Sequence, residues 1–194
     1  FLMSNIQSVV KNLNSLHDFE LINRAIDGDR GCFAEIVTRH KSTIATTAIN
    51  MLGDMEEAKE IGQQVFIRFY KSMHTFKKES KLSTYLTRIT INLCLNHLKR
   101  TKIMQSRSLE LKVAVHQTSE HFSSDIENKE LVNLTLQYLN EKHRAVLVLR
   151  MIKGYSTEET AQILDVPSGT VLSRLKRAMD HFKTILTNEL KYEG

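Results

Sequence analysis

Residues 154–178 read GYSTEETAQILDVPSGTVLSRLKRA, and this stretch decides how the C-terminal part of the chain folds. Ser156 followed three residues later by Glu159 is a capping-box pattern, which predicts a helix that begins near Thr157. Residues 139–150, LNEKHRAVLVLR, predict another helix directly before it, since apolar residues recur there at helical spacing.

A tight turn and a second, basic helix follow. Pro167 ends the first helix, because proline disfavours the α conformation of the residue before it, and we expect Ser168 to cap the next helix. The inward positions of that helix are Val171, Leu175 and Ala178, and its candidate DNA contacts are Ser168, Gly169, Thr170, Ser173, Arg174, Lys176 and Arg177. This order of elements is typical of a DNA-reading helix-turn-helix. The alternative is an ordinary helical hairpin with a solvated basic face.

Composition favours an all-α chain. The chain has 194 residues, and one Pro with seven Gly suits long helices joined by few turns. A hydrophobic fraction of 41% allows packed cores of two small domains. The net charge of +5 is only moderately basic, so the placement of the charges matters more than their sum.

The two cysteines, Cys32 and Cys94, lie far apart on apolar helical faces. We expect both to be buried, small hydrophobic residues of a protein in the reducing cytoplasm, and not a disulfide or a metal site. No signal peptide and no apolar run of membrane-spanning length is evident, so no membrane insertion is expected.

Two domains are predicted. After an N-terminal extension (1–17), residues 18–102 form a block of helices over about 18–26, 31–52, 55–70 and 82–100. Periodicity is lost over 103–126, which we interpret as a flexible linker. Residues 127–194 form the helix-turn-helix domain.

A basic loop and the helix after it, residues 77–100, form a second candidate site. Cationic residues for the backbone, an aromatic ring for stacking and amides for base edges suit single-stranded nucleic acid. The candidate contacts are Lys78, Ser80, Ser83, Thr84, Tyr85, Arg88, Asn92 and Asn96. By residue type alone, an equally good interpretation places Tyr85 in the core and the other residues on a solvated surface.

The helix before that loop has an acidic and amide-rich outer face that includes Glu57, Glu60, Gln63 and Gln64. Such a face is a poor partner for DNA; it suits a protein partner or, by default, solvent. No phosphate-binding glycine loop, nucleophile elbow or paired-carboxylate motif is present, and His116 and His121 lack further ligands at metal-binding spacing. We therefore expect neither an enzyme nor a bound cofactor or metal.

The two blocks, in this order and spacing, resemble the extracytoplasmic-function (ECF) group of bacterial sigma-70-type RNA polymerase sigma factors. The resemblance rests on FAEIV (33–37), LGDMEEA (52–58), QQVFIR (63–68) and STYLTRI (83–89) in the first block. In the second it rests on LNEKHRAVL (139–147) and PSGTVLSRLKRA (167–178). It covers nearly the whole chain apart from the N-terminus and the linker.

The resemblance implies a role for each surface. The third helix would dock on the clamp helices of the largest polymerase subunit through Glu57, Glu60, Gln63, Gln64, Phe66 and Arg68. The loop and helix from Lys78 to Asn96 would capture a base of the -10 element and help to open the duplex. The last helix would read the -35 element in the major groove near the polymerase flap region. An anti-sigma factor is the further partner that the family implies.

The sequence departs from the family pattern at four positions. Tyr85 stands where many members have Trp, Gly62 interrupts the docking helix, Gln64 replaces a frequent acid, and Asp165 occupies a turn position where Gly is common. Asp tolerates the left-handed conformation better than most residues, so we expect the turn to survive. These departures leave the family resemblance intact, but they affect which promoter sequence we would expect the protein to prefer.

A stand-alone helix-turn-helix regulator, with the first block as a sensing or dimerising domain, is the alternative function. A pure protein-interaction module is a third, which leaves Arg174 and Arg177 without a role. The basic loop with Tyr85 distinguishes a sigma factor from a stand-alone regulator, because a protein that reads only double-stranded DNA does not need such a loop. Without a partner, the two domains either move freely or pack together and mask their own DNA surfaces; the sequence leaves both open.

Overall fold

The computed structural model describes residues 13–77, 79–108 and 124–189, and all regular secondary structure in these ranges is helical. The first unit contains α2 (Asp18–Ile26), α3 (Arg30–Leu52), α4 (Met55–Ser72), the short η1 (Met73–Thr75) and α5 (Leu82–Ser108). The second contains α6 (Ser124–Tyr138), α7 (Glu141–Leu147), η2 (Val148–Ile152), α8 (Thr157–Leu164), α9 (Ser168–Thr184) and η3 (Ile185–Glu189). The all-α prediction with a C-terminal helix-turn-helix is confirmed.

Helix boundaries follow from capping residues. Asp29 precedes α3, and its carboxylate accepts hydrogen bonds from the amides of Gly31 (2.9 Å) and Cys32 (3.2 Å). Gly53 ends α3 with φ of +74°, a left-handed conformation that glycine adopts without steric cost. Asp54 then caps α4 by accepting from the amide of Glu57 at 2.8 Å. The helices expected over about 31–52 and 55–70 therefore meet at Gly53 and Asp54, as the predicted ranges imply.

Two details of the expected helices were wrong. The helix expected to end near Arg100 continues as α5 to Ser108. Its extension contains no Gly or Pro, so nothing in the local backbone chemistry stops it. Ser168 is not a cap: it is the first residue of α9, behind Pro167 in the capping position, where proline's fixed φ suits a helix entrance. Residues 109–123, most of the expected linker, lie outside the described residues.

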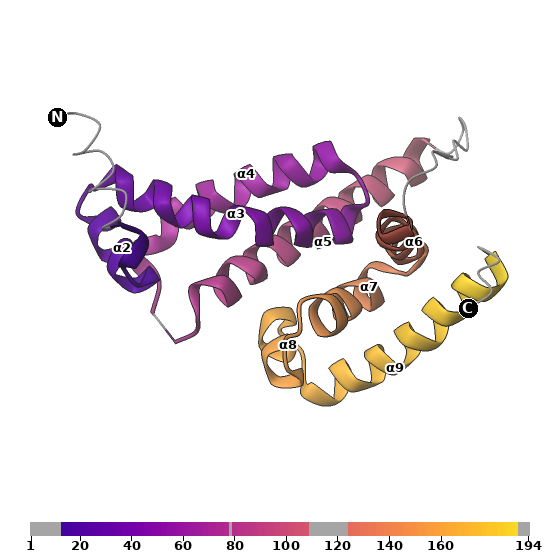
Figure 1. The fold of residues 1–194 in the computed structure, drawn as a ribbon. Coiled ribbons are helices and arrows are strands. Elements are labelled where there is room, and N and C mark those ends of the chain that lie inside the picture. The colour runs from indigo at the N-terminus through magenta and orange to yellow at the C-terminus, as the bar shows by residue number, and fades with distance from the viewer. Residues whose placement is uncertain (1–12, 78, 109–123, 190–194) are drawn as a thin grey trace.

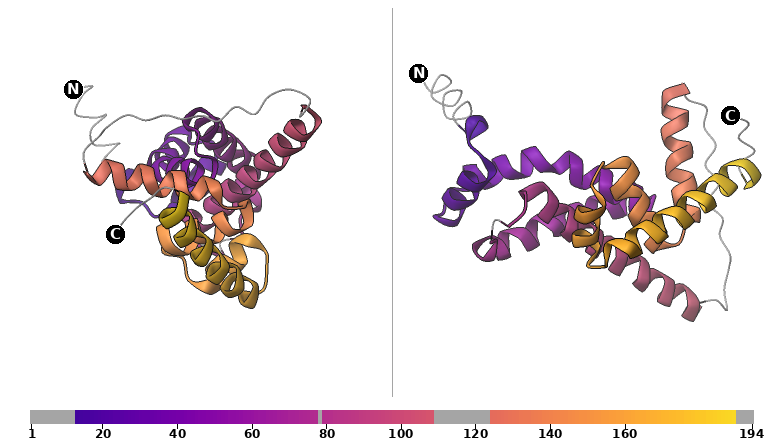
Figure 2. Two further views of the ribbon diagram at one scale, coloured as in Figure 1. Left: turned by 90° about the vertical axis from the view of Figure 1, so that its right-hand side faces the viewer. Right: turned by 90° about the horizontal axis from the view of Figure 1, so that it is seen from below.

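Helices α3, α4 and α5 lie alongside one another, and the C-terminal helices gather on one flank of this bundle (Figures 1 and 2). The α5 helix is long enough for its C-terminal part to project beyond the bundle. In the centre, large side chains such as Ile36, Met51, Phe69 and Ile91 are fully buried. Burial of this kind, worth about 1.5–3 kcal/mol for each large apolar side chain, supplies most of the stability.

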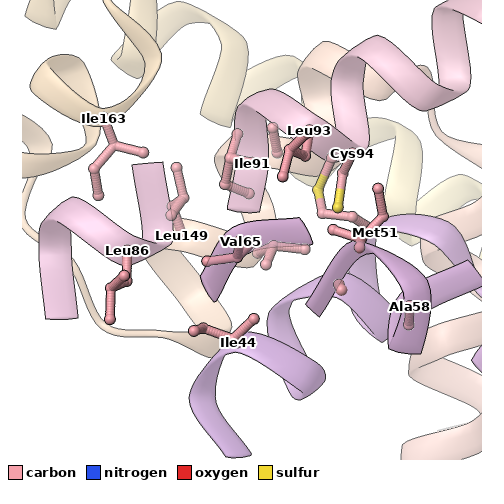
Figure 3. Close-up of a cluster of buried hydrophobic side chains, with 14 of the residues drawn as sticks. Ile44, Met51, Ala58, Val65, Leu86, Ile91, Leu93, Cys94, Leu149 and Ile163 are labelled. Atoms are coloured by element: carbon pink, nitrogen blue, oxygen red, sulfur yellow. The ribbon is translucent and has the colours of Figure 1, made fainter. Parts of the chain in front are cut away.

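The core does not stop at the boundary between the two units. Leu149 and Ile163 of the second unit belong to the same buried cluster as Leu86 and Val65 of the first (Figure 3). The helix-turn-helix keeps a small cluster of its own around Val146, Ala161 and Val171. Of the two arrangements that the sequence left open, the structure shows the domains packed together.

Candidate nucleic-acid and protein interfaces

The helix-turn-helix has the capping geometry that its sequence predicts. The Ser156 hydroxyl accepts from the Glu159 amide at 3.1 Å, and the Glu159 carboxylate accepts from the Ser156 amide at 2.8 Å. Asp165 ends α8 in the left-handed conformation at φ of +53°, the only non-glycine residue with positive φ in the part of the chain described. A residue there costs roughly 1 kcal/mol more than glycine. The tight turn therefore forms with aspartate in the position where the family commonly has glycine.

The first half of α9 carries the predicted DNA contacts. Val171 and Ala178 are buried and Leu175 is half-buried, as expected. On the outer face Ser168, Gly169, Ser173, Lys176 and Arg177 are exposed, while Thr170 and Arg174 are half-buried. All seven predicted residues are thus at least partly accessible along the first half of α9, although at 100° per residue they spread over more than one face of the helix. Guanidinium and ammonium groups beside hydroxyls are suited to phosphate and base-edge contacts.

His143 of α7 lies behind this basic face, and sequence reasoning did not single it out. Its amide donates to the Asn140 side chain at 2.9 Å, which caps α7. Burial, followed by the positive charges of His181, Arg177 and Arg174, lowers the pKa of His143 below its usual value. His143 belongs to the stretch 139–150 that was singled out in the sequence. Its proximity to α9 could not be predicted there, because it depends on how α7 and α9 pack.

The outer face of α4 matches the predicted protein-docking surface only in part. Glu60, Gln63 and Arg68 are exposed; Gln64 is half-buried and donates to Glu60 at 3.0 Å. Glu57 is half-buried. Its carboxylate lies 3.1 Å from the imidazole of His97 in α5, which is within ion-pair distance. The angle between the two groups does not meet the criterion for a hydrogen bond.

Phe66 differs from the expectation for a polymerase contact, because its side chain is half-buried and packs against the core. Ile67 and Tyr70 are instead exposed, each at 54%. The ring of Tyr70 also rests edge-on against Phe33, at a centroid distance of 4.9 Å. With Gln63, these two residues form a continuous outward stripe at helical spacing.

The candidate single-strand site lies at the start of α5. Lys78 lies outside the described residues. Ser80 and Ser83 are half-buried, Thr84 is buried, and Arg88, Asn92 and Asn96 are exposed on one face of the helix. The amide and guanidinium stripe is therefore accessible, as predicted, whereas the hydroxyl groups at the helix start lie in a recess.

Tyr85 combines the two interpretations that its sequence allowed. It is half-buried, with its ring 4.8 Å from that of Phe76 and 6.1 Å from that of Phe69, and its hydroxyl lies 3.4 Å from that of Ser72. It also lines a cavity of about 290 Å³ together with Glu79, Ser80, Thr84, Arg88, Gln162 and Ile163. A cavity of this size, with an aromatic wall and polar groups, is of the order needed for a nucleobase.

Polar contacts also join the C-terminal unit to α5 and α3. The hydroxyls of Thr87 and Tyr155 lie 3.0 Å apart. The Lys153 ammonium donates to the carbonyl of Thr43 at 3.4 Å and to the hydroxyl of Thr46. Burial lowers the pKa of Lys153, because the ammonium loses part of its hydration.

A buried guanidinium links the C-terminal unit to α3. Arg144, 6% exposed, donates to the Met51 carbonyl of α3, to the Gln137 side chain (2.5 Å) and carbonyl (2.8 Å), and to the Leu139 carbonyl (3.0 Å). Gln137 also donates to the Asn50 carbonyl at 3.4 Å. Desolvation lowers the pKa of Arg144 to about 10, so it remains charged at neutral pH.

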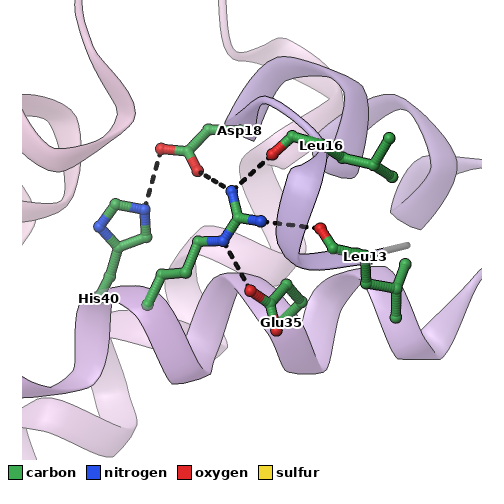
Figure 4. Close-up of polar contacts among 6 residues, drawn as sticks. Leu13, Leu16, Asp18, Glu35 and His40 are labelled. Carbon is green, nitrogen blue, oxygen red and sulfur yellow. Dashed lines mark hydrogen bonds and ion pairs between the residues drawn. The ribbon is translucent and has the colours of Figure 1, made fainter. Parts of the chain in front are cut away.

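A second arginine holds the N-terminal segment against α3 (Figure 4). Arg39 donates to the carbonyls of Leu16 (2.7 Å) and Leu13 (2.8 Å) and pairs with Glu35 (2.7 Å) and Asp18 (3.2 Å). The Asp18 carboxylate also lies 3.0 Å from the imidazole of His40. This network fixes α2 beside the bundle.

The cysteine prediction is confirmed as far as burial goes: Cys32 and Cys94 are buried and free. Desolvation raises the pKa of Cys32 to about 11 and that of Cys94 to about 12, so both are unreactive thiols. Within the described ranges, no group of three His, Cys, Asp or Glu side chains is placed to hold a metal ion. No described helix is long and apolar enough to cross a membrane.

Two family models match the chain: sigma-70 region 2 over residues 36–103, and sigma-70 region 4 over residues 129–182. The RNA polymerase sigma-H factor of Pseudomonas aeruginosa is 31% identical over 179 residues, covering 87% of this chain and 93% of that protein. The ECF RNA polymerase sigma factor SigW of Bacillus subtilis is 30% identical over 172 residues, covering 82% and 91%.

Two solved structures share the fold. CnrH, in complex with the cytosolic domain of CnrY, matches with a TM-score of 0.64 at 23% identity, over 87% of this chain and 96% of that one. The sigma factor RpoE of Bartonella quintana, in complex with the anti-sigma factor NepR, matches with a TM-score of 0.65 at 20% identity, over 80% and 97%.

Proposed function

This chain belongs to the sigma-70 family of RNA polymerase sigma factors, within the extracytoplasmic-function group, and we propose how it divides promoter binding among its surfaces. Residues 18–102 dock on core polymerase and open the -10 element, and residues 127–194 read the -35 element. Residues 103–126 connect the two. The protein works in the cytoplasm, where polymerase and promoter DNA are found.

This proposal is supported by two accessible surfaces of different character in one chain. The α9 face presents an exposed basic helix start of major-groove type. The start of α5 instead presents an aromatic-walled cavity beside an exposed Arg88–Asn92–Asn96 stripe. A flat cavity wall of this kind suits an unstacked base and has no use on an intact duplex.

Docking on polymerase falls to the α4 stripe. Glu60, Gln63 and Arg68 offer polar groups, and Ile67 with Tyr70 adds the apolar area that a stable protein interface needs. The clamp helices of the largest subunit are the partner that the family resemblance names for this helix, and the flap region is the partner for the C-terminal unit. An anti-sigma factor is a further partner, supported by the complexes in which the two similar structures were solved.

The test is promoter-dependent transcription by core polymerase with the purified protein, which separates a sigma factor from a stand-alone regulator. Within it, Tyr85→Ala should impair open-complex formation and leave binding to a -35 duplex unchanged. Arg174→Ala should weaken binding to a -35 duplex and leave open-complex formation unchanged. A protein that binds a promoter tightly by itself and gives no transcript with core polymerase is a regulator, and equal loss of both activities in Tyr85→Ala removes the proposed division.

A further inference from the structure

Leu172 is a large apolar residue on the outer surface of α9. Its side chain is 55% exposed, whereas the preceding residue, Val171, is 0% exposed and packs in the small cluster of the helix-turn-helix. Leu172 belongs to neither of the two buried clusters found among the described residues. Packing within the chain therefore does not explain why a leucine occupies this position.

The neighbours of Leu172 on the helix surface are candidate DNA contacts. In a helix, the residues three and four positions away lie beside a side chain. For Leu172 these residues are Ser168, Gly169, Leu175 and Lys176. Leu175 is half-buried and packs against the core, whereas the other three are exposed. Leu172 therefore stands on the part of α9 that we assign to the -35 element, although it was not among the contacts predicted from the sequence.

The surface on the N-terminal side of Leu172 is formed by two small residues. Long side chains of an α-helix lean toward its N-terminus, so the leucine extends over Ser168 and Gly169. A Cβ built on Gly169 meets nothing within 4 Å, so the packing of the chain does not require glycine at this position. Small residues beside an exposed leucine leave room for a base pair to approach its methyl groups closely.

The arginines of the same helix lie elsewhere around its circumference. At 100° per residue, Arg174 is rotated by about 200° and Arg177 by about 140° from Leu172. Their guanidinium groups suit the phosphate backbone, which positions a helix in the groove without reading sequence. Leu172 carries no charge and suits the base edges instead.

Major-groove chemistry identifies the group that a leucine recognises. Of the base-edge groups presented there, the C5 methyl of thymine is the apolar one, and the others are hydrogen-bond donors and acceptors. A leucine forms no hydrogen bond, so it would leave the amino group of a cytosine or the acceptors of a guanine without a partner. Contact with the methyl group of thymine has no such cost.

We propose that Leu172 is a specificity-determining residue for the -35 element, and that its side chain packs against the C5 methyl of a thymine in the major groove. The inference rests on the proposed function, since it uses the assignment of α9 to that element. It adds a base to the assignment: the preferred -35 element contains a thymine where Leu172 meets it, recognised by its methyl group.

The test uses core polymerase that carries the full-length protein and a pool of duplexes of random sequence, from which the best-retained duplex is isolated. Each thymine of its -35 element, in either strand, is then replaced by uracil, which lacks only the C5 methyl. Binding is measured in the cold, so that strand opening does not contribute. At one position, loss of the methyl group should weaken wild-type binding about fourfold. Leu172→Ala should bind the thymine duplex more weakly by at least about the same factor, and uracil at that position should cost this variant nothing further.

Two control variants make the outcome specific. Met179→Ala removes another large apolar side chain of α9, 42% exposed. That residue lies about 10 Å further along the helix axis, so the variant should keep the full preference for thymine over uracil. Leu172→Met retains an apolar side chain at the position and should keep most of the preference. The uracil scan of the wild-type protein does not depend on the folding of any variant.

The inference is overturned if every uracil substitution in the -35 element leaves wild-type binding unchanged, or if the uracil effect persists in Leu172→Ala. It is also overturned if Leu172→Ala binds core polymerase more weakly but keeps the thymine preference, because the residue then contacts protein. Failure of the proposed function has a different signature: polymerase that carries the protein then retains no duplex sequence in preference to others, and the inference fails with it.

Discussion

Replacement of Arg144 by methionine tests the link between the two units most directly. The guanidinium is almost completely buried and donates to three backbone carbonyls and one side-chain amide oxygen. Methionine fills a similar volume but donates no hydrogen bond, so the Met51, Gln137 and Leu139 carbonyls lose a partner. The substitution therefore removes the polar contacts while keeping most of the packing.

The magnitude follows from those acceptors. A buried polar group left without a partner costs roughly 1–3 kcal/mol, and three carbonyls give a gross loss of several kcal/mol. Burying methionine instead of a desolvated charge offsets part of this loss. We expect the free energy of unfolding to fall by about 3 kcal/mol for Arg144→Met. Arg144→Lys keeps the charge but loses the planar fork of donors, so its loss should be intermediate.

Urea denaturation followed by far-ultraviolet circular dichroism measures this loss, with Arg150→Met as the matched control. Arg150 is a half-buried arginine of the same unit whose guanidinium donates to a single carbonyl, that of Tyr155, so its replacement should cost about 1 kcal/mol. The pKa of Arg144, lowered to about 10 by burial, predicts that the difference from wild type is flat between pH 6 and 8. A loss below about 1 kcal/mol, or one equal to that of Arg150→Met, refutes the reasoning.

Three further predictions concern single sites. Gly62→Ala should raise the free energy of unfolding by roughly 0.5–1 kcal/mol in thermal denaturation, because a Cβ there meets only Ile44 at an ordinary 3.9 Å and glycine is costly inside a helix. His143→Gln should flatten the stability profile near pH 6: the native pKa lies below the unfolded value, so wild type alone loses stability as pH falls through 6.5. Arg174→Ala should weaken binding to a -35 duplex and reduce the salt slope by about 1; an unchanged slope shows that Arg174 does not face phosphate.

Local signals in the sequence were sufficient for most of the helices. The capping box of Ser156 and Glu159, the Gly-Asp stop after α3 and the left-handed Asp165 all depend on residues within a few positions of one another. Hydrophobic periodicity likewise predicted that helices span about residues 31–52 and 55–70, where α3 and α4 lie. Where no breaker is present, as after Arg100, the sequence underestimated the helix, because loss of amphipathicity marks the end of packing and not the end of a helix.

Contacts between segments that are distant in the sequence could not be predicted from such local signals. Ile163 is apolar whether it faces its own unit or α5, and its neighbour Ala161 faces the other core. Tyr85 was ambiguous between stacking and burial, because the positions of Phe69 and Phe76 determine how much of its ring is covered. The candidate residues were therefore predictable by type and helix face, whereas the shared cavity was not.

The turn between α3 and α4 offers a last test of how the units pack. An ideal Cβ built on Gly53 lies 2.6 Å from the Cδ of Gln137 in α6, and Gly53 has φ of +74°. Gly28 also has a positive φ, +99°, but a Cβ there meets nothing within 4 Å. Both Gly→Ala substitutions carry the backbone strain, roughly 1 kcal/mol, and only Gly53→Ala must displace Gln137.

Displacement of Gln137 is costly because its side chain is held by Arg144 and by the Asn50 carbonyl. Gly53→Ala should therefore destabilise the protein by about 1–2 kcal/mol more than Gly28→Ala in urea denaturation, an excess comparable to the hydrogen bonds that Gln137 gives up. Gly53→Ala combined with Gln137→Ala should cost less than the sum of the two single changes, since the second alanine removes the clash. Equal losses for the two glycines, or strict additivity in the pair, would place the end of α6 away from this turn in solution.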